Sequence, residues 1–139
     1  MYNIIKRCIF CKIASHEVPS YKIYENDHVL AFLDLSQTSI GHTLVIPKKH
    51  FNNILELDDN SAADVFKVVT YLSKKISKNL DVKNLNIINN NGPLAGQTVD
   101  HFHIHIIPRY DDDEISFNYP SHKLTEEEFN RLKEKILAN

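Results

Sequence analysis

The sequence contains no run of apolar residues that approaches the ~20 needed to span a bilayer. Its first residues, from Met1 to Cys8, also lack the apolar centre of a secretory signal. Neither sign of charge dominates, since 16 lysines and arginines stand against 18 aspartates and glutamates, for a formal net charge of -2. We therefore expect a cytoplasmic protein that is held neither by nucleic-acid phosphates nor by a membrane surface.

The length and composition are those of an ordinary soluble domain. The chain has 139 residues, of which 42% are hydrophobic and 24% charged. These proportions exclude intrinsic disorder and collagen-like structure, and the length suits one domain with one core. We expect residues 1–139 to form a single domain.

Cysteine is scarce, with only Cys8 and Cys11 in the chain. The two are too close in sequence to brace a fold, and reducing cytosol would not keep them oxidised. Their spacing lets both thiolates reach one zinc ion at ~2.3 Å, but a tetrahedral site needs two further ligands. A redox dithiol and a buried dithiol without metal are the alternatives, although no thioredoxin-like βαβ pattern surrounds the pair.

The pattern of apolar residues predicts five strands, one long helix and a C-terminal helix. The predicted elements are a helical turn at 11–15, strands at 21–24, 29–33, 42–46, 85–88 and 102–107, a helix at about 59–79, and a helix that follows a capping box starting at Thr125. Pro47 and Pro108 are expected to end the third and fifth strands. This order indicates an α+β fold with a mostly antiparallel sheet of about five strands and one long helix packed on it.

Histidine, in contrast, is abundant. The chain has eight histidines, and three of them, His101, His103 and His105, alternate with apolar residues. Alternate residues of a strand share a face, so the three imidazoles are expected on one face and the residues between them in the core. Neutral imidazole is a nucleophile and its protonated form a general acid, which suits catalysis, and a metal site is the other functional interpretation.

The segment before this strand favours anion binding. Residues 90–98 offer amides, a hydroxyl and glycines, which allow backbone N–H groups to approach a phosphate closely. The segment is not a Walker loop, because no Gly-Lys-Ser/Thr follows it. The acidic run at 111–114 is interpreted as a solvated loop in preference to a metal site.

The segment His101-Phe102-His103-Ile104-His105-Ile106-Ile107 resembles the His-x-His-x-His-x-x signature of the histidine triad (HIT) nucleotide-binding family. The resemblance continues through residues 32–36, 41–50 and 95–99, in the family's order, and weakens after Arg109. It implies a HIT-like α+β fold, with the segment 111–139 less well matched.

The resemblance also implies a reaction. In the family, the middle histidine, here His103, attacks the α-phosphorus of a nucleoside 5′-phosphoramidate or polyphosphate. Water then hydrolyses the nucleotidyl-histidine, and no catalytic metal is required. By the same likeness, His105 contacts the phosphate, and His42 stands where the family has an additional active-site histidine.

Further positions match the family's nucleotide-binding residues. Asp34 resembles the residue that accepts both ribose hydroxyls, although the residue pattern alone favours a turn residue. The other matched positions are Leu35 at the base, Asn90 and Thr98 at the ribose-phosphate, and Gly96 and Gln97 in the same loop. Asparagine at position 90 is typical of the branch that cleaves P–N bonds, so a purine nucleoside phosphoramidate is the expected substrate. A dinucleoside polyphosphate hydrolase and a nucleotide-binding module with incidental hydrolysis are the alternatives.

The likeness supplies two more expectations. Bacterial members with the N-terminal cysteine pair complete a structural zinc site with two histidines, which correspond here to His50 and His101. The family is usually a homodimer, which we expect to form through the helix at 59–79 and the strand at 85–88. Eukaryotic members often carry a C-terminal tryptophan near the partner's active site, and this sequence has no tryptophan.

Overall fold

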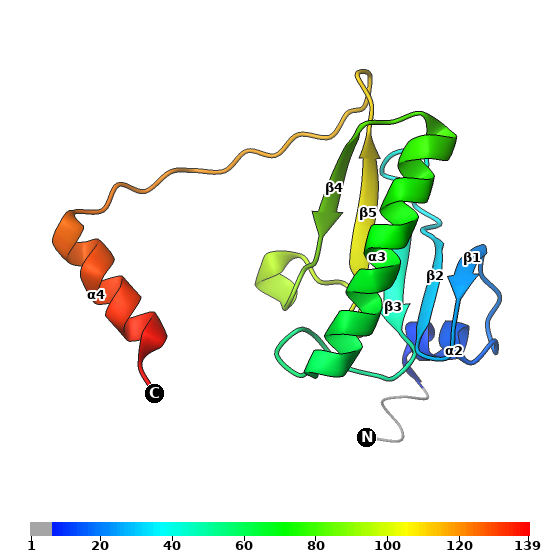
Figure 1. Ribbon diagram of the computed structural model, residues 1–139, viewed down its shortest axis with the longest axis horizontal. Helices are drawn as coiled ribbons and strands as arrows, with labels where there is room; N and C mark the ends of the chain where they lie inside the picture. Colours follow the sequence, from blue (N-terminus) through cyan, green and yellow to red (C-terminus); the bar gives the residue numbers. More distant parts are fainter. Residues whose placement is uncertain (1–6) are drawn as a thin grey trace.

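The computed structural model describes residues 7–139 (Figure 1). The expectation that the chain starts without a secretory signal concerns residues that lie mostly outside this range. One antiparallel sheet has the strand order β1-β2-β3-β5-β4, which confirms the predicted α+β class. The elements are α2 (Ile9–Ala14), β1 (Lys22–Glu25), β2 (Val29–Leu33), β3 (Thr43–Pro47), α3 (Asp59–Leu80), β4 (Asn84–Ile88), the 3₁₀ turn η1 (Pro93–Ala95), β5 (Ile104–Arg109) and α4 (Glu126–Leu137).

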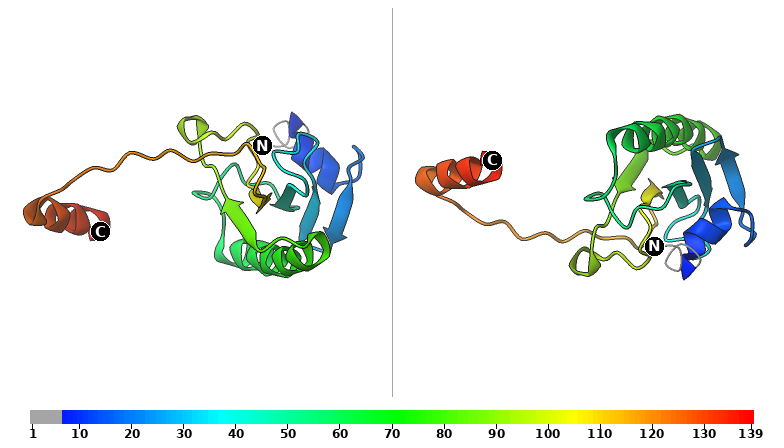
Figure 2. Two further views of the ribbon diagram at one scale, coloured as in Figure 1. Left: turned by 90° about the horizontal axis from the view of Figure 1, so that it is seen from above. Right: turned by 90° about the horizontal axis from the view of Figure 1, so that it is seen from below.

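The sheet is covered by a different helix on each face (Figure 2). Because side chains alternate along a strand, Val29 and Ala31 of β2 pack into the core under α3, whereas Leu30 and Phe32 pack with α2. Every residue of β2 except the last is therefore buried. The α2 face is the one on which the candidate site lies.

Helix α3 begins and ends with clear capping interactions. The Asp58 side chain accepts a hydrogen bond from Ser61 N–H, and Asp81 ends the helix in the left-handed conformation. The face toward the sheet buries residues at helical spacing, namely Val65, Val68, Val69, Leu72 and Ile76. Across residues 7–139, no helix combines the length and the apolar character that crossing a membrane requires.

Pro47 is the last residue of β3, as the sequence predicted, whereas β5 starts at Ile104 and runs one residue past Pro108 to Arg109. Proline lacks an N–H but keeps its carbonyl, and both carbonyls accept side-chain hydrogen bonds here. His101 Nε2 donates to Pro47 O at 2.8 Å, and Ser39 Oγ donates to Pro108 O at 2.6 Å. Because β5 starts at Ile104, His101 and His103 lie in the segment just before it.

The C-terminal segment leaves the sheet as an extended arm that ends in α4, which lies apart from the body (Figure 1). The arm starts at an ion pair in which Arg109 Nε and an Nη donate to the two carboxylate oxygens of Asp113, at 2.8 and 2.9 Å. Helix α4 begins with the predicted capping box of Thr125 and Glu128. Its apolar residues are exposed, namely Phe129, Leu132, Ile136 and Leu137.

Candidate active site

A cleft of about 710 Å³ opens between α2, the ends of the central strands and the two loops that follow β2 and β4. Its floor is apolar where α2 meets the sheet, and polar groups gather at one end. The lining residues include Ile9, Phe10, Ile13, Tyr21, Phe32, Asp34, Leu35, Leu44, Thr98, Val99, His103 and His105. The cleft therefore combines an apolar slot with a histidine-rich end, as a nucleotide-sized ligand requires.

The protonated nitrogen of His103 can be deduced from its partner. Nδ1 lies 2.7 Å from the backbone carbonyl of His101. A carbonyl only accepts, so Nδ1 carries the proton and the lone pair is on Nε2. The side chain is almost fully buried and lies edge-on against Phe10, and burial lowers the His103 pKa. Neutral His103 thus presents a nucleophilic nitrogen.

His42 and His105 form a directed pair. The Thr38 N–H donates to His42 Nδ1 at 3.3 Å, so the His42 proton is on Nε2. Nε2 donates in turn to His105 Nδ1 at 2.9 Å, which leaves an N–H on Nε2 of His105. Burial lowers the pKa of both rings, and in His105 the neighbouring His103 and His42 add to this effect and bring it to about 4. The pair is neutral at pH 7 and offers a donor beside His103.

The loop that carries Asp34 and His42 is braced by Gln37, a residue that sequence reasoning missed. Its Nε2 donates to the carbonyls of Asp34 and His42, and its Oε1 accepts from Gly41 and His42 N–H. Gly41 has φ +100°, and a Cβ there would lie 2.6 Å from Leu80 Cδ1. The positive φ and the close contact both favour glycine at position 41. The hydrogen bonds of Gln37 hold the neighbouring His42 against the sheet.

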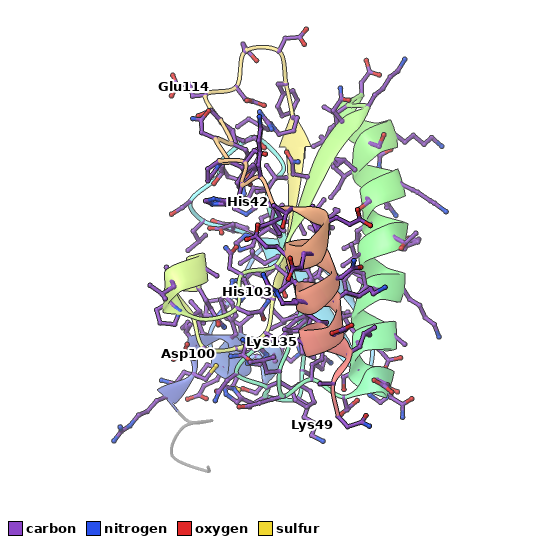
Figure 3. All side chains as sticks on the ribbon, turned by 90° about the vertical axis from the view of Figure 1, so that its left-hand side faces the viewer. His42, Lys49, Asp100, His103, Glu114 and Lys135 are labelled. Carbon is purple, nitrogen blue, oxygen red and sulfur yellow. The ribbon has the colours of Figure 1, made fainter. Side chains whose placement is uncertain are left out.

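Asp34 makes a turn interaction and also borders the cleft. Oδ1 accepts from Ser36 N–H at 2.8 Å, which is a turn interaction. Oδ2 lies 3.6 Å from His42 Nε2, and the residue lines the cleft. His42 and His103 lie on the same side of the molecule, with His42 toward the Glu114 end and His103 toward the Asp100 end (Figure 3).

The loop after β4 is held by Gln97. Its Oε1 accepts from Gly92 N–H at 2.7 Å, and its Nε2 donates to the carbonyls of Asn52 and Val99. Gln97 is buried, so its side chain shapes the loop from within. Gly96 has φ +89°, a conformation that other residues rarely adopt. Thr98 lines the cleft, and the half-buried Asn90 lies beside Gly96.

A second cluster gathers the predicted metal ligands Cys8, Cys11, His50 and His101. Their ligand atoms all lie within 4.8 Å of one another. Cys8 Sγ lies 3.3 Å from His101 Nδ1, and Cys11 Sγ lies 3.3 Å from His50 Nδ1 and 3.5 Å from His101 Nδ1. Ligands of a tetrahedral zinc ion with bonds of about 2.0–2.3 Å are about 3.3–3.8 Å apart. The donor set and its spacing fit zinc.

The outer contacts orient both histidines of this cluster. His101 Nε2 donates to Pro47 O at 2.8 Å, and His50 Nε2 donates to Asn52 Oδ1 at 2.9 Å. Each ring therefore turns its unprotonated Nδ1 toward the cysteines, as a metal site needs. Burial is the main cause that raises the pKa of the Cys11 thiol, to about 12, so a bound cation would be needed to hold a thiolate there.

The triad is thus divided between two sites. His103 and His105 border the cleft with ring centroids 4.9 Å apart, whereas His101 turns toward the cysteine pair. The model of the HIT domain family matches residues 15–112 of this chain. The chain belongs to the HIT family. The histidines of the cysteine cluster and the cleft histidines all fall inside the matched HIT region.

Known HIT proteins resemble the chain along most of its length. Adenosine 5′-monophosphoramidase hnt1 of Schizosaccharomyces pombe is 43% identical over 130 residues, which cover 93% of this chain and 95% of the relative. The crystal structure of a HIT family protein from Bacillus subtilis is 43% identical, with a TM-score of 0.90 over 96% of this chain and 99% of that one. A zinc-bound histidine triad family protein from Mycobacterium smegmatis is 34% identical, with a TM-score of 0.76 over 85% and 86% of the two chains.

Proposed function

We propose that the chain hydrolyses purine nucleoside 5′-phosphoramidates through a covalent nucleotide on His103. The observation that carries the proposal is the 2.7 Å hydrogen bond from His103 Nδ1 to the His101 carbonyl, which leaves the Nε2 lone pair available in the cleft. The phosphoramidase named above, at 43% identity over nearly the full chain, supports the same reaction class. The chain is accordingly a HIT-family hydrolase, and the purine phosphoramidate is the substrate that we propose for it.

The proposed chemistry balances as two displacements at phosphorus. In the first, the Nε2 lone pair of His103 forms an N–P bond to the α-phosphorus, while the bond from phosphorus to the amine breaks and the amine leaves with a proton taken from solvent. In the second, water attacks the same phosphorus and gives one proton back to solvent, the His103–phosphorus bond breaks, and the nucleoside monophosphate leaves. A histidine nucleophile divides one difficult displacement into two easier ones.

The neighbouring groups have matching roles in this proposal. The N–H on Nε2 of His105, directed by His42, is suited to donate to a phosphoryl oxygen as charge develops on it. Asp34 retains acceptor capacity on its carboxylate for ribose hydroxyls, and Leu35 borders the apolar slot where the base would lie. Asn90 and Thr98 border the phosphate end.

The test compares two substrates in parallel, adenosine 5′-phosphoramidate and diadenosine tetraphosphate, for the native protein and for His103→Ala. The proposal predicts rapid AMP release from the first substrate, which the substitution abolishes. A preference for diadenosine tetraphosphate would move the chain to the polyphosphate hydrolases. Tight AMP binding without turnover that depends on His103 would leave a nucleotide-binding module.

We also propose that zinc binds Cys8, Cys11, His50 and His101 as a structural ion. The ligand spacing and the two outward N–H donors support this assignment. The ion would supply a cross-link between the N-terminal segment, the loop after β3 and the segment before β5. The chain would supply four ligand atoms. Two of them belong to the rings of His50 and His101, whose outer hydrogen bonds set their orientation.

We further propose a homodimer through α3 and β4. β4 lies at the edge of the sheet, so one side of its backbone is available for pairing. Phe66 on α3 and Ile87 on β4 are 46% and 43% exposed, so each offers apolar surface to a partner. The exposed apolar side of α4 supports association between chains.

A further inference from the structure

The nucleophile lies just beyond the end of the sheet. Pairing of β3 with β5 ends at Val45 opposite Ile104, and pairing of β4 with β5 ends at Ile88 opposite His105. Neither neighbouring strand therefore offers His103 a backbone partner in the regular pattern. Because His103 is only 4% exposed, its carbonyl needs a donor from elsewhere.

Asn89 supplies this donor. The residue follows the last position of β4, and its Nδ2 donates to the His103 carbonyl at 2.9 Å. A side-chain amide thus replaces the next hydrogen bond of the strand pair, and the backbone of residues 89–92 is free to turn toward the cleft. Of the three consecutive asparagines, only Asn90 matches a family position, and nothing in their order distinguishes Asn89.

The orientation of the Asn89 amide is set by Asn91. Asn91 Nδ2 donates to Asn89 Oδ1, which keeps Nδ2 of Asn89 directed at His103. Asn91 is held in its turn, because its Oδ1 accepts from Ile54 N–H at 2.8 Å. Three groups in series, from the loop after β3 to the nucleophile, therefore have only one consistent arrangement of donors and acceptors.

We propose that Asn89 and Asn91 are positioning residues for His103; the inference rests on the proposed function above. The ring of His103 donates to the His101 carbonyl. The backbone carbonyl of His103 accepts from Asn89, which directly follows β4. Both hydrogen bonds are needed to aim Nε2 into the cleft, because rotation of the His103 peptide would move the ring and its acceptor apart. Neither asparagine is among the residues that line the cleft.

The test uses near-isosteric Asn→Asp substitutions, which change hydrogen bonding but hardly change volume. Asn89→Asp removes the donor and places a carboxylate against the His103 carbonyl. Asn91→Asp keeps the acceptor for Ile54 N–H but loses the donor that orients Asn89. Asn118→Asp, at an exposed position outside α3 and β4, is the matched control for the added charge.

The first readout is the rate at which the nucleotide transfers to His103 in a single turnover. A small misplacement of a reacting group costs about 10²-fold in rate, so we expect Asn89→Asp to slow the transfer by about 30- to 100-fold and Asn91→Asp by about 10-fold. KM and the affinity for AMP should change less than about threefold, and the control should match the native protein. A loss in AMP affinity as large as the loss in rate would overturn the proposal, since it would place the asparagines in binding.

The second readout is the nitrogen-15 spectrum of the His103 ring, which reports the protonated nitrogen without any turnover. We expect the Nδ1–H form in the native protein and in Asn118→Asp, and a reduced share of it in Asn89→Asp. Asn91→Asp leaves Asn89 in place and serves if Asn89→Asp does not fold. Unchanged spectra and rates in a folded variant would refute the inference. If the native protein lacks turnover but the spectra change as expected, the proposed function fails and the positioning stands.

Discussion

Backbone groups decide which nitrogen carries the proton in each histidine of the cleft. The His101 carbonyl accepts from His103 Nδ1, and the Thr38 N–H donates to His42 Nδ1. The first interaction leaves the lone pair on Nε2 of His103. The second leaves the His42 proton on Nε2, which donates to His105 Nδ1, so that His105 carries its own proton on Nε2. The nucleophile and the donor therefore differ because of their backbone neighbours, although all three are the same residue type.

The ribose contact proposed for Asp34 can be tested with one substitution. The side-chain oxygen of an asparagine at this position could still accept from Ser36 N–H, so Asp34→Asn should keep the turn. Hydrogen bonds to a charged group contribute about 1.5–3 kcal/mol, and we therefore expect KM for a ribonucleoside phosphoramidate to rise by at least about tenfold. The 2′,3′-dideoxy substrate is the control, and its KM should not respond. An equal rise for both substrates would contradict the ribose contact.

The buried histidines also predict how stability depends on pH. The pKa of His105 is lowered from 6.5 to about 4 in the folded chain, mainly by burial. Between these values the unfolded chain binds a proton that the folded chain does not, so the free energy of unfolding falls as the pH falls from 6.5 toward 4. Urea unfolding at about pH 7.5, 6 and 5 measures this slope.

His105→Gln should flatten that dependence, because glutamine does not titrate. The exposed His28→Gln should keep the native dependence and serves as the matched control. The comparison between variants removes the contribution of the metal ligands, which are present in all three proteins. The same slope in His105→Gln as in the native protein would show that His105 is not held neutral by the fold.

The spacing of the triad identified its members because alternation is visible in a single sequence. Gln37 and Asn52 were missed because they act on backbone groups or on histidines that belong to other segments. An isolated amide in a polar loop has no local pattern that separates such a role from ordinary solvent exposure. The assignment of His101 to the metal cluster came from the family resemblance, and alternation alone would have placed it with His103.

Among the elements, helix α2 depends most on the cysteine pair. The helix has only six residues and buries Phe10, Ile13 and Ala14 against the sheet. Such a short helix has little stability of its own, and Cys8 and Cys11 connect its first turn to His50 and His101. Because Phe10 also lies against His103, the cluster of Cys8, Cys11, His50 and His101 supports one wall of the cleft.

Removal of zinc should therefore lower the thermal stability. An ion present at about 1,000 times its dissociation constant contributes about 4 kcal/mol, which corresponds to roughly 10 °C in Tm for a chain of this size. We expect one zinc per chain and a fall of about 10 °C in Tm on chelation, measured by calorimetry. Cys8→Ser should show the lower Tm without chelator and no further response to it. A native protein with no zinc and no response to chelation would contradict the assignment.

The predicted elements were confirmed, and their ends differ where tertiary contacts decide them. Periodicity located α3 because its buried positions repeat at helical spacing from Val65 to Ile76. The predicted start of β5 was wrong by two residues because the segment before it hydrogen-bonds to Phe51 and Asn89 instead of continuing the ladder. The sequence pattern at Phe102 and His103 is the same as inside the strand, so it could not reveal this change.

Apolar side chains are exposed on three elements of the molecule. α3 exposes Phe66, Tyr71 and Leu80, β4 exposes Ile87, and α4 lies away from the body on its arm (Figure 1). The family match ends at residue 112, so most of the arm and α4 lie beyond the matched domain. The capping box predicted α4, but the sequence held no information on what its apolar side contacts.

The homodimer can be tested by the mass in solution. Light scattering at micromolar concentration should give twice the mass of one chain. A double substitution, Phe66→Glu with Ile87→Glu, should give the mass of one chain, because it buries like, unpaired charges at the proposed interface. Leu55→Lys, at a residue that is 88% exposed outside α3 and β4, is the control and should remain dimeric. A native protein with the mass of one chain would refute the dimer.

The central claim is that Nε2 of His103 takes the nucleotide, and the most direct measurement is the mass of the trapped intermediate. The protein is mixed with adenosine 5′-phosphoramidate, quenched in alkali after a fraction of a turnover, digested and analysed by mass spectrometry. We predict one AMP on the peptide that contains His103, and none in His103→Ala, whose affinity for AMP should be retained. Turnover in His103→Ala at the native rate, or AMP attached to a different residue, would contradict this claim.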